Sequence, residues 1–129
     1  MSIEAGLKGR AETAVTPGNT ARAMGSGTVP VFATPSMAAL MESAAVQAVQ
    51  SHLGEGESTV GTRLDVTHDA ATPIGMKVWA EAELTQVDGR KLTFAVTAFD
   101  EAGKIGGGTH ERVIIKVEKF LTRTQEKWK

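Results

Sequence analysis

The chain has 129 residues, a mass of 13.6 kDa and a formal net charge of −1, which is the size of one domain. Its 14 basic and 15 acidic residues provide no positive field for nucleic acid, so we exclude nucleic acid as a partner. The absence of cysteine excludes disulfides, thiolate nucleophiles and thiolate metal sites. Uninterrupted apolar stretches reach only about five residues against the ~20 of a membrane span. Residues 1–10 contain no apolar region typical of a signal peptide, so we expect none. We expect a small soluble protein of the cytoplasm without a membrane partner.

The pattern of the chain predicts a single domain over residues 1–129 with three zones. The first zone holds one short strand around 10–16, where Ala11, Thr13 and Val15 recur at every second position. A loop over 17–30 follows, and its prolines and glycines are typical of a mobile, lid-like segment.

The second zone is predicted to be one long helix over residues 35–53. Thr34 and Pro35 form a start signal, as a hydroxyl N-cap and a proline in the first turn, and Gly54 is a stop signal. Because the apolar stripe is rich in alanine, another surface can approach it closely, so we expect the helix to lie inside the fold. The stripe consists of Met37, Leu40, Met41, Ala44, Ala45, Ala48 and Val49.

The third zone, residues 57–121, is predicted to be a strand meander. Apolar and polar residues alternate along 62–68, 76–84, 92–98 and 109–119, which is typical of strands. Turn signals at Asp88-Gly89 and Ala102-Gly103 separate the later strands. The fold class is therefore α+β, with a curved antiparallel sheet of about five strands wrapped around one long central helix.

Few residues of this chain can perform acid–base chemistry, because it has no tyrosine or cysteine and only three histidines. No nucleophile elbow, P-loop, dinucleotide-binding turn or metal-ligand spacing occurs, so we expect no metal and no cofactor. Glu42 borders the helix stripe and has two interpretations. It is either a charge that reaches water or a buried carboxylate that acts as base or nucleophile. His68 lies on the same strand face as Leu64 and Val66, which we expect to face the core. It is either a structural histidine with all its hydrogen bonds satisfied or an acid–base group.

Two further features of the sequence have both a structural and a functional interpretation. His110 opens the last predicted strand and is expected at the surface or in a turn. Arg112 and the basic C-terminal stretch are either ordinary solvated charge or a site for phosphate groups. The stretch contains Lys116, Lys119, Arg123, Lys127 and Lys129.

Several blocks of the sequence resemble a known family. Val31-Phe32-Ala33-Thr34-Pro35-Ser36-Met37, followed by Leu40-Met41-Glu42, resembles the start of the central helix in the fluoroacetyl-CoA thioesterase-like family of hotdog-fold acyl-CoA thioesterases. Val66-Thr67-His68 and Thr109-His110-Glu111-Arg112 match later blocks of that family, in the same order, within about residues 29–121.

The resemblance implies a hotdog fold, a homodimer with active sites at the subunit interface, and hydrolysis of an acyl-CoA thioester. It implies a Thr–Glu–His constellation that falls on Thr34, Glu42 and His68. Coenzyme A would enter as part of the acyl-CoA substrate. The resemblance also assigns three residues to substrate binding: Gly61 beside the acyl pocket, Arg112 near the substrate entrance, and Phe32.

The segment before the helix departs from the fluoroacetate-selective members, whose phenylalanines cover the acyl group. Here Gly25-Ser26-Gly27-Thr28-Val29-Pro30 contains no aromatic residue, so we expect a thioesterase for short acyl chains without strong fluoroacetyl selectivity. Two other functions remain open at this point. One is a non-catalytic acyl-CoA binding or sensing module, and the other is a hotdog dehydratase or isomerase.

Overall fold

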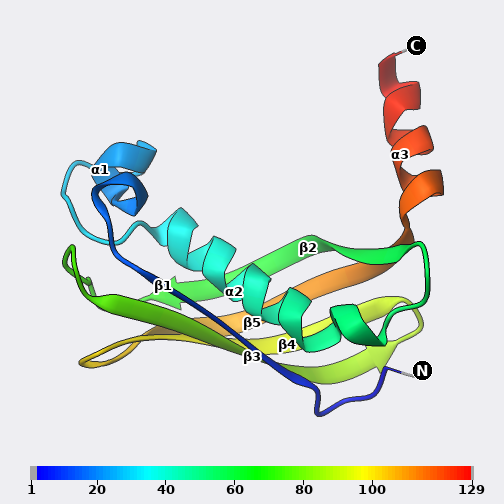
Figure 1. The fold of residues 1–129 in the computed structure, drawn as a ribbon, viewed down its shortest axis with the longest axis horizontal. Coiled ribbons are helices and arrows are strands. Elements are labelled where there is room, and N and C mark those ends of the chain that lie inside the picture. Colours follow the sequence, from blue (N-terminus) through cyan, green and yellow to red (C-terminus); the bar gives the residue numbers. More distant parts are fainter. Residues whose placement is uncertain (1–2, 129) are drawn as a thin grey trace.

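The computed structural model describes residues 3–128, which form a five-stranded antiparallel sheet curved around one long helix (Figure 1). The sheet has the order β1-β3-β4-β5-β2, so β1 and β2 are its two edges. This confirms the predicted α+β class and its architecture. The strands are β1 (Lys8–Ala14), β2 (Glu57–His68), β3 (Lys77–Asp88), β4 (Lys91–Asp100) and β5 (Gly103–Lys116).

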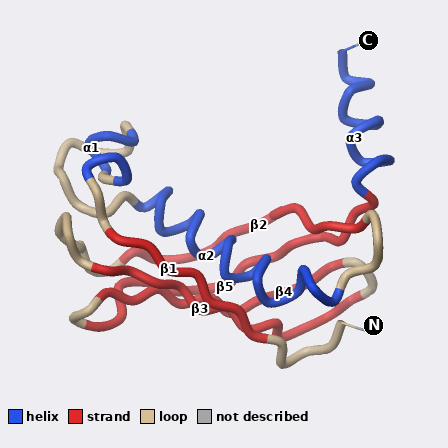
Figure 2. The backbone as a smooth tube through the Cα atoms, viewed as in Figure 1, coloured by secondary structure: helices blue, strands red, loops and turns tan. Residues whose placement is uncertain are grey.

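The long helix α2 (Thr34–Val49) lies across the concave face of the sheet and ends in a 3₁₀ turn, η2 (Gln50–His52) (Figure 2). It connects β1 at one edge of the sheet to β2 at the other. Only β3, β4 and β5 therefore form a meander, which is narrower than the meander predicted for 57–121. None of the helices within residues 3–128 is long and apolar enough to cross a membrane.

The core lies between α2 and the sheet. Its helix residues are buried as the stripe predicts, except Leu40, which is partly buried at the edge of the core. Alternate residues of β3 and β4 supply the other half: Val78, Ala80, Ala82, Leu84, Leu92, Phe94, Val96 and Ala98. The alanines of α2 allow very close contact with β1. A Cβ atom at Gly9 would collide with the backbone of Ala44 and Ala48.

The start of α2 differs from the prediction. The N-cap residue is Ala33, and Thr34 is already the first residue of the helix, without a capping hydrogen bond from a side chain. The Thr34 hydroxyl instead lies 2.8 Å from Nδ1 of His68. The assignment of Thr34 as N-cap is therefore wrong, because a partner that is distant in sequence takes up its hydroxyl.

Residues 17–30 contain more regular structure than the predicted loop. A 3₁₀ turn, η1 (Pro17–Asn19), precedes a short helix, α1 (Ala21–Met24). The Thr20 hydroxyl caps this helix by accepting a hydrogen bond from the Ala23 N–H at 3.3 Å. Mobility of this segment as a lid stays a prediction.

The last strand also differs from the prediction at both ends. β5 begins at Gly103 and ends at Lys116, and the residues predicted to extend it form helix α3 (Val117–Gln125), followed by a 3₁₀ turn, η3 (Glu126–Trp128). Figure 1 shows α3 leaving the sheet and pointing away from it. The tight turn between β3 and β4 consists of Gly89 and Arg90, one residue later than predicted, with Gly89 at a φ of +61°.

Pairing with β4 decides which face of β5 is buried. His110 lies opposite Phe94 and Arg112 lies opposite Leu92, so both polar residues share the face that α2 covers. His110 is only 1% exposed and Arg112 is 7% exposed. The prediction of His110 at the surface and the interpretation of Arg112 as solvated charge are both wrong.

Candidate active site

The first polar cluster lies where α2 begins and β2 ends. It joins Thr34 and His68 through the 2.8 Å hydrogen bond between Oγ1 and Nδ1. Phe32 is buried and its ring contacts the His68 ring edge-on, with 6.5 Å between ring centroids. A cavity of about 210 Å³ adjoins this cluster, and Ala21 and Ser26 of the predicted lid segment line it on the other side.

The electrostatics of this cluster keep His68 neutral at neutral pH. Burial lowers the pKa of His68 from its ordinary value of 6.5, although the charge of Asp69 and the nearby Ala70 backbone oppose this shift. A neutral imidazole has one nitrogen that accepts a proton. The contact with Thr34 fits either tautomer, because Nδ1 accepts from the hydroxyl when it is unprotonated and donates to the hydroxyl oxygen when it carries the proton.

The other ring nitrogen of His68 distinguishes it from a structural histidine. Nε2 is buried and has no hydrogen-bond partner among residues 3–128. Buried polar atoms of native proteins are nearly always paired, and the exceptions concentrate at functional sites. The unpaired Nε2 therefore favours the interpretation of His68 as an acid–base group over that of a satisfied structural histidine.

The second polar cluster surrounds Glu42, in the middle of α2. Glu42 Oε2 lies 3.5 Å from Arg112 Nη1, and the glutamate side chain is 45% exposed. The half-exposed carboxylate fits the interpretation of a charge that reaches water, and the buried carboxylate of the other interpretation is not observed. Gly61 makes room for it: a Cβ atom there would lie 2.5 Å from Glu42 Oε2 and 3.3 Å from Arg112 Nη1.

Three residues contact the Arg112 guanidinium: Thr59, His110 and Glu42. Its Nε donates to the Thr59 hydroxyl at 2.8 Å, and Nη2 donates to the Thr59 carbonyl at 3.1 Å. His110 Nδ1 lies 2.7 Å from the Arg63 carbonyl. A carbonyl can only accept, so Nδ1 carries the proton and Nε2 accepts from Arg112 Nη1 at 3.1 Å.

The protonation states of this cluster follow from the same contacts. Burial lowers the pKa of His110, and the neighbouring Arg112 cation adds to the shift, while the hydrogen bond with the Arg63 carbonyl opposes it. Burial also lowers the pKa of Arg112, against the attraction of Glu42, but a guanidinium stays charged in proteins. The cluster is therefore a neutral histidine that fixes a buried cation, and the cation faces a carboxylate.

The predicted site residues thus form two groups within one chain. Thr34, His68 and Phe32 lie together, and Glu42, Gly61 and Arg112 lie together. Among the described residues, the hydrogen bonds and ion pairs of Glu42 lead to Arg112 and not to Thr34 or His68.

The sequence analysis missed two members of the second group, Thr59 and His110. The glycines at 106–108 interrupt the apolar alternation, so the strand seemed to begin after them. The one available signal for His110 was its alternation with Arg112 and Ile114, which follows the apolar face of β4. Thr59 had no such signal.

Comparison with known proteins agrees with this architecture. Residues 15–118 match a family described as fluoroacetyl-CoA-specific thioesterase. The fluoroacetyl-CoA thioesterase of Streptantibioticus cattleyicolor is 48% identical over 97 residues, which cover 75% of this chain and 70% of the relative.

Solved structures extend the similarity to the whole fold. The fluoroacetyl-CoA thioesterase FlK matches with a TM-score of 0.92 and 39% identity over 98% of both chains. A thioesterase superfamily member from Thermus thermophilus matches with a TM-score of 0.88 and 34% identity, over 98% of this chain and 96% of that one. A hot-dog-like protein from Thermanaerovibrio acidaminovorans, at 22% identity over 98% of this chain and 94% of that one, shares the fold with a TM-score of 0.89.

The fold and these relatives define a class, the hotdog-fold thioesterases, which are thioester hydrolases. Within that class, this chain belongs to the fluoroacetyl-CoA-specific thioesterase family.

The lowered pKa values of His68 and His110 predict that stability depends on pH. Between the folded-state pKa and the ordinary 6.5, the unfolded chain binds more protons than the folded one. The contribution of both histidines to the free energy of unfolding is therefore complete above about pH 6.5 and is lost as the pH falls through the folded-state pKa. Urea unfolding should give a lower free energy at about pH 5 than at about pH 7.5. The decrease should be smaller in His68→Gln, and an unchanged decrease would contradict the shift at His68.

Proposed function

We propose that this chain hydrolyses short-chain acyl-CoA thioesters to the free acid and CoA, with Thr34, Glu42 and His68 as its catalytic residues. The observation that carries the proposal is the hydrogen bond between Thr34 and a neutral His68, beside a cavity, with the second nitrogen of His68 buried and unpaired. The relatives support the substrate class, because threonine and phenylalanine variants of FlK were solved in complex with acetyl-CoA and with fluoroacetate and CoA.

Each of the three residues fits one requirement of thioester hydrolysis. His68 accepts a proton from the attacking water molecule and returns it to the departing sulfur, which suits an imidazole that is neutral near pH 7. Thr34 lies in the first turn of α2, where its hydroxyl and the unpaired N–H groups stabilise negative charge on the thioester oxygen. Glu42, held in place by Arg112, either orients the attacking water molecule whose proton His68 takes, or attacks the carbonyl itself and expels CoA thiolate. In the second case water hydrolyses the resulting anhydride, and His68 passes a proton of that water to the thiolate.

The separation of the two clusters supports an active site shared between two chains. Thr34 and Glu42 are eight residues apart on α2, which corresponds to about 12 Å along the helix axis. One thioester carbonyl cannot contact both residues of the same chain at that separation.

The edge strand β2 offers the way to join the clusters. β2 carries Gly61, next to Glu42, in its first half and His68 at its end. An edge strand has unpaired backbone groups that favour pairing with another strand. Antiparallel pairing of β2 with its copy around a twofold axis would bring the end of one strand toward the start of the other. We therefore propose a homodimer in which Glu42 of one protomer faces Thr34 and His68 of the other.

Substitution of the acid–base residues should abolish turnover. We expect Glu42→Gln and His68→Ala each to lower kcat by about 10²–10⁴, and the double variant to lose little more than the worse single one. Thr34→Ala should lower activity with little change in stability, because Thr34 caps no helix. Release of free thiol from acetyl-CoA measures these effects, with Glu55→Gln on an exposed turn as the control. Full turnover in Glu42→Gln would contradict the catalytic role of Glu42, whereas no turnover in the wild type would favour a binding module.

Mixing two inactive variants tests the shared site. The protein should sediment at about twice 13.6 kDa. Glu42→Gln mixed and refolded with His68→Ala should regain about a quarter of the wild-type activity, because half of the dimers would be mixed and each would hold one intact site. A stable monomer, or a mixture as inactive as its components, would contradict a site between protomers.

The cavity beside Thr34 and His68, where we place the acyl group, predicts that the enzyme accepts a broad range of short acyl groups. Phe32 is the one phenylalanine among the described residues that line the cavity, and the segment 25–30 adds no aromatic ring. A small change in the acyl group is worth ~1–3 kcal/mol in a shaped pocket, and a pocket without lid aromatics should lie at the lower end of this range. We therefore expect kcat/KM for fluoroacetyl-CoA and acetyl-CoA to differ by no more than about tenfold. Propionyl- and butyryl-CoA complete the panel. A preference for fluoroacetyl-CoA of about a hundredfold or more would show that selectivity does not require lid aromatics.

A further inference from the structure

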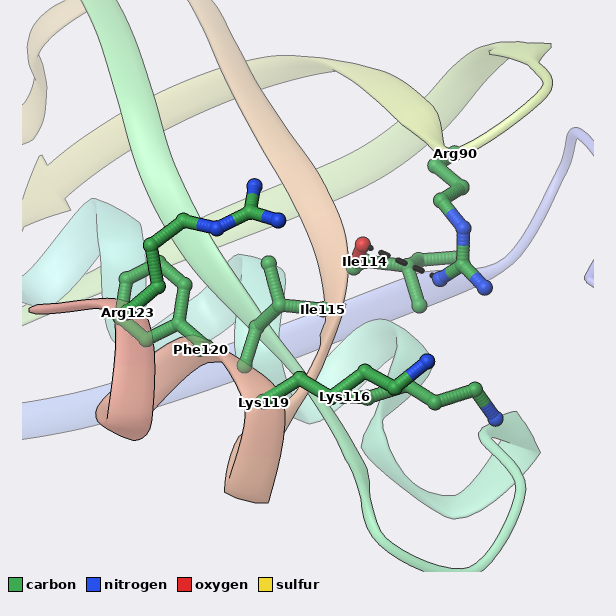
Figure 3. Close-up of a pocket in the computed structure, with 7 residues that line it drawn as sticks. All are labelled: Arg90, Ile114, Ile115, Lys116, Lys119, Phe120 and Arg123. Carbon is green, nitrogen blue, oxygen red and sulfur yellow. Dashed lines mark hydrogen bonds between the residues drawn. The ribbon is translucent and has the colours of Figure 1, made fainter.

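A groove of about 300 Å³ lies between helix α3 and the end of β5, apart from both polar clusters (Figure 3). Its apolar lining comes from Ile114, Ile115 and Phe120. Phe120 is 38% exposed, so part of its ring is free to contact a ligand. A flat aromatic surface next to aliphatic side chains suits the stacking of a nucleobase.

Four cationic side chains line the same groove: Arg90, Lys116, Lys119 and Arg123. No carboxylate is among the described residues that line it, although the chain as a whole has a net charge of −1. Arg90 is partly neutralised, because it lies 3.8 Å from Glu57 and donates to the Ile114 carbonyl at 3.3 Å. The other three cations form no ion pair with a carboxylate within residues 3–128.

The spacing of these three cations is unfavourable unless an anion binds. Lys119 and Arg123 are four residues apart on α3, where like charges repel each other, and Lys116 precedes Lys119 by three residues. Lysine and arginine side chains that line one groove suit phosphate oxygens, which accept charge-assisted hydrogen bonds from both.

The position of the groove fits a ligand that also reaches the proposed active site. β5 carries Arg112, beside Glu42, and Lys116 four residues further on, which corresponds to about 13 Å along the strand. In CoA, the flexible pantetheine arm separates the thioester from the phosphates. A protein that binds the thioester near Glu42 must therefore bind the phosphates some distance away.

We propose that this groove binds the nucleotide end of CoA, which is a 3′-phosphorylated adenosine diphosphate. Lys116, Lys119 and Arg123 neutralise its phosphates, and Phe120 and Ile115 contact the adenine. The proposal rests on the proposed acyl-CoA thioesterase function. It assigns a role to the basic C-terminal residues, which the catalytic chemistry does not use.

The test compares two substrates in a variant that removes two of the cations, Lys119→Ala with Arg123→Ala. Both side chains are exposed on α3, so the fold does not depend on them. We expect KM for acetyl-CoA to rise about tenfold or more, with kcat within about twofold of the wild type. KM for S-acetylpantetheine, which lacks the nucleotide, should stay unchanged. Lys127→Ala removes a cation of the same segment that does not line the groove and should change neither KM.

A binding measurement separates this proposal from the proposed function. Calorimetry should detect adenosine 3′,5′-bisphosphate binding to the wild type and to Lys127→Ala but not to the double variant, whether or not the protein hydrolyses acyl-CoA. Four results would overturn the proposal. They are an unchanged KM for acetyl-CoA, an equal rise for both substrates, inorganic phosphate binding as tightly as the bisphosphate, and a changed oligomeric state, which would make the groove a protein interface.

Discussion

The close contact between α2 and the sheet is the constraint on which the other features depend. Alanines on the buried face of the helix let it approach β1 until no side chain fits between them, as Gly9 shows. A helix fixed at this depth has no freedom to rotate or slide, because interiors pack as densely as organic crystals. The same contact therefore determines where Thr34 and Glu42, on one helix, meet residues of β2 and β5.

The polar network around Arg112 is the main departure from an apolar core. A buried guanidinium is costly unless its donors are paired, and here Thr59, His110 and Glu42 accept from it or face it. His110 fits this role because its other nitrogen is committed to a backbone carbonyl. The network places a fixed positive charge beside the half-exposed carboxylate of Glu42. Burial of this charge lowers stability, so a role in binding or catalysis explains the network better than a role in folding.

Taken together, the two proposals divide the recognition of acyl-CoA between the two ends of the molecule. The cavity near Thr34 and His68 is small, which matches the size of a short acyl group. The groove between α3 and β5 is larger and is lined by cations. Helix α3 buries none of its residues in the chain and leaves an apolar and basic face free. In this scheme α3 serves binding, and the core contributes the catalytic residues.

By itself, the sequence determined the elements and the faces that they bury, because periodicity is local: the α2 stripe and the alternation of β3 and β4 are buried as predicted. It also determined the candidates Thr34, Glu42 and His68, through their residue types and a family resemblance. Only the tertiary structure decided that Thr34 bonds His68 instead of capping α2, since the two lie far apart in the chain. It likewise decided that His110 and Arg112 face inward, because their face is set by pairing with β4 and not by the glycines that precede them.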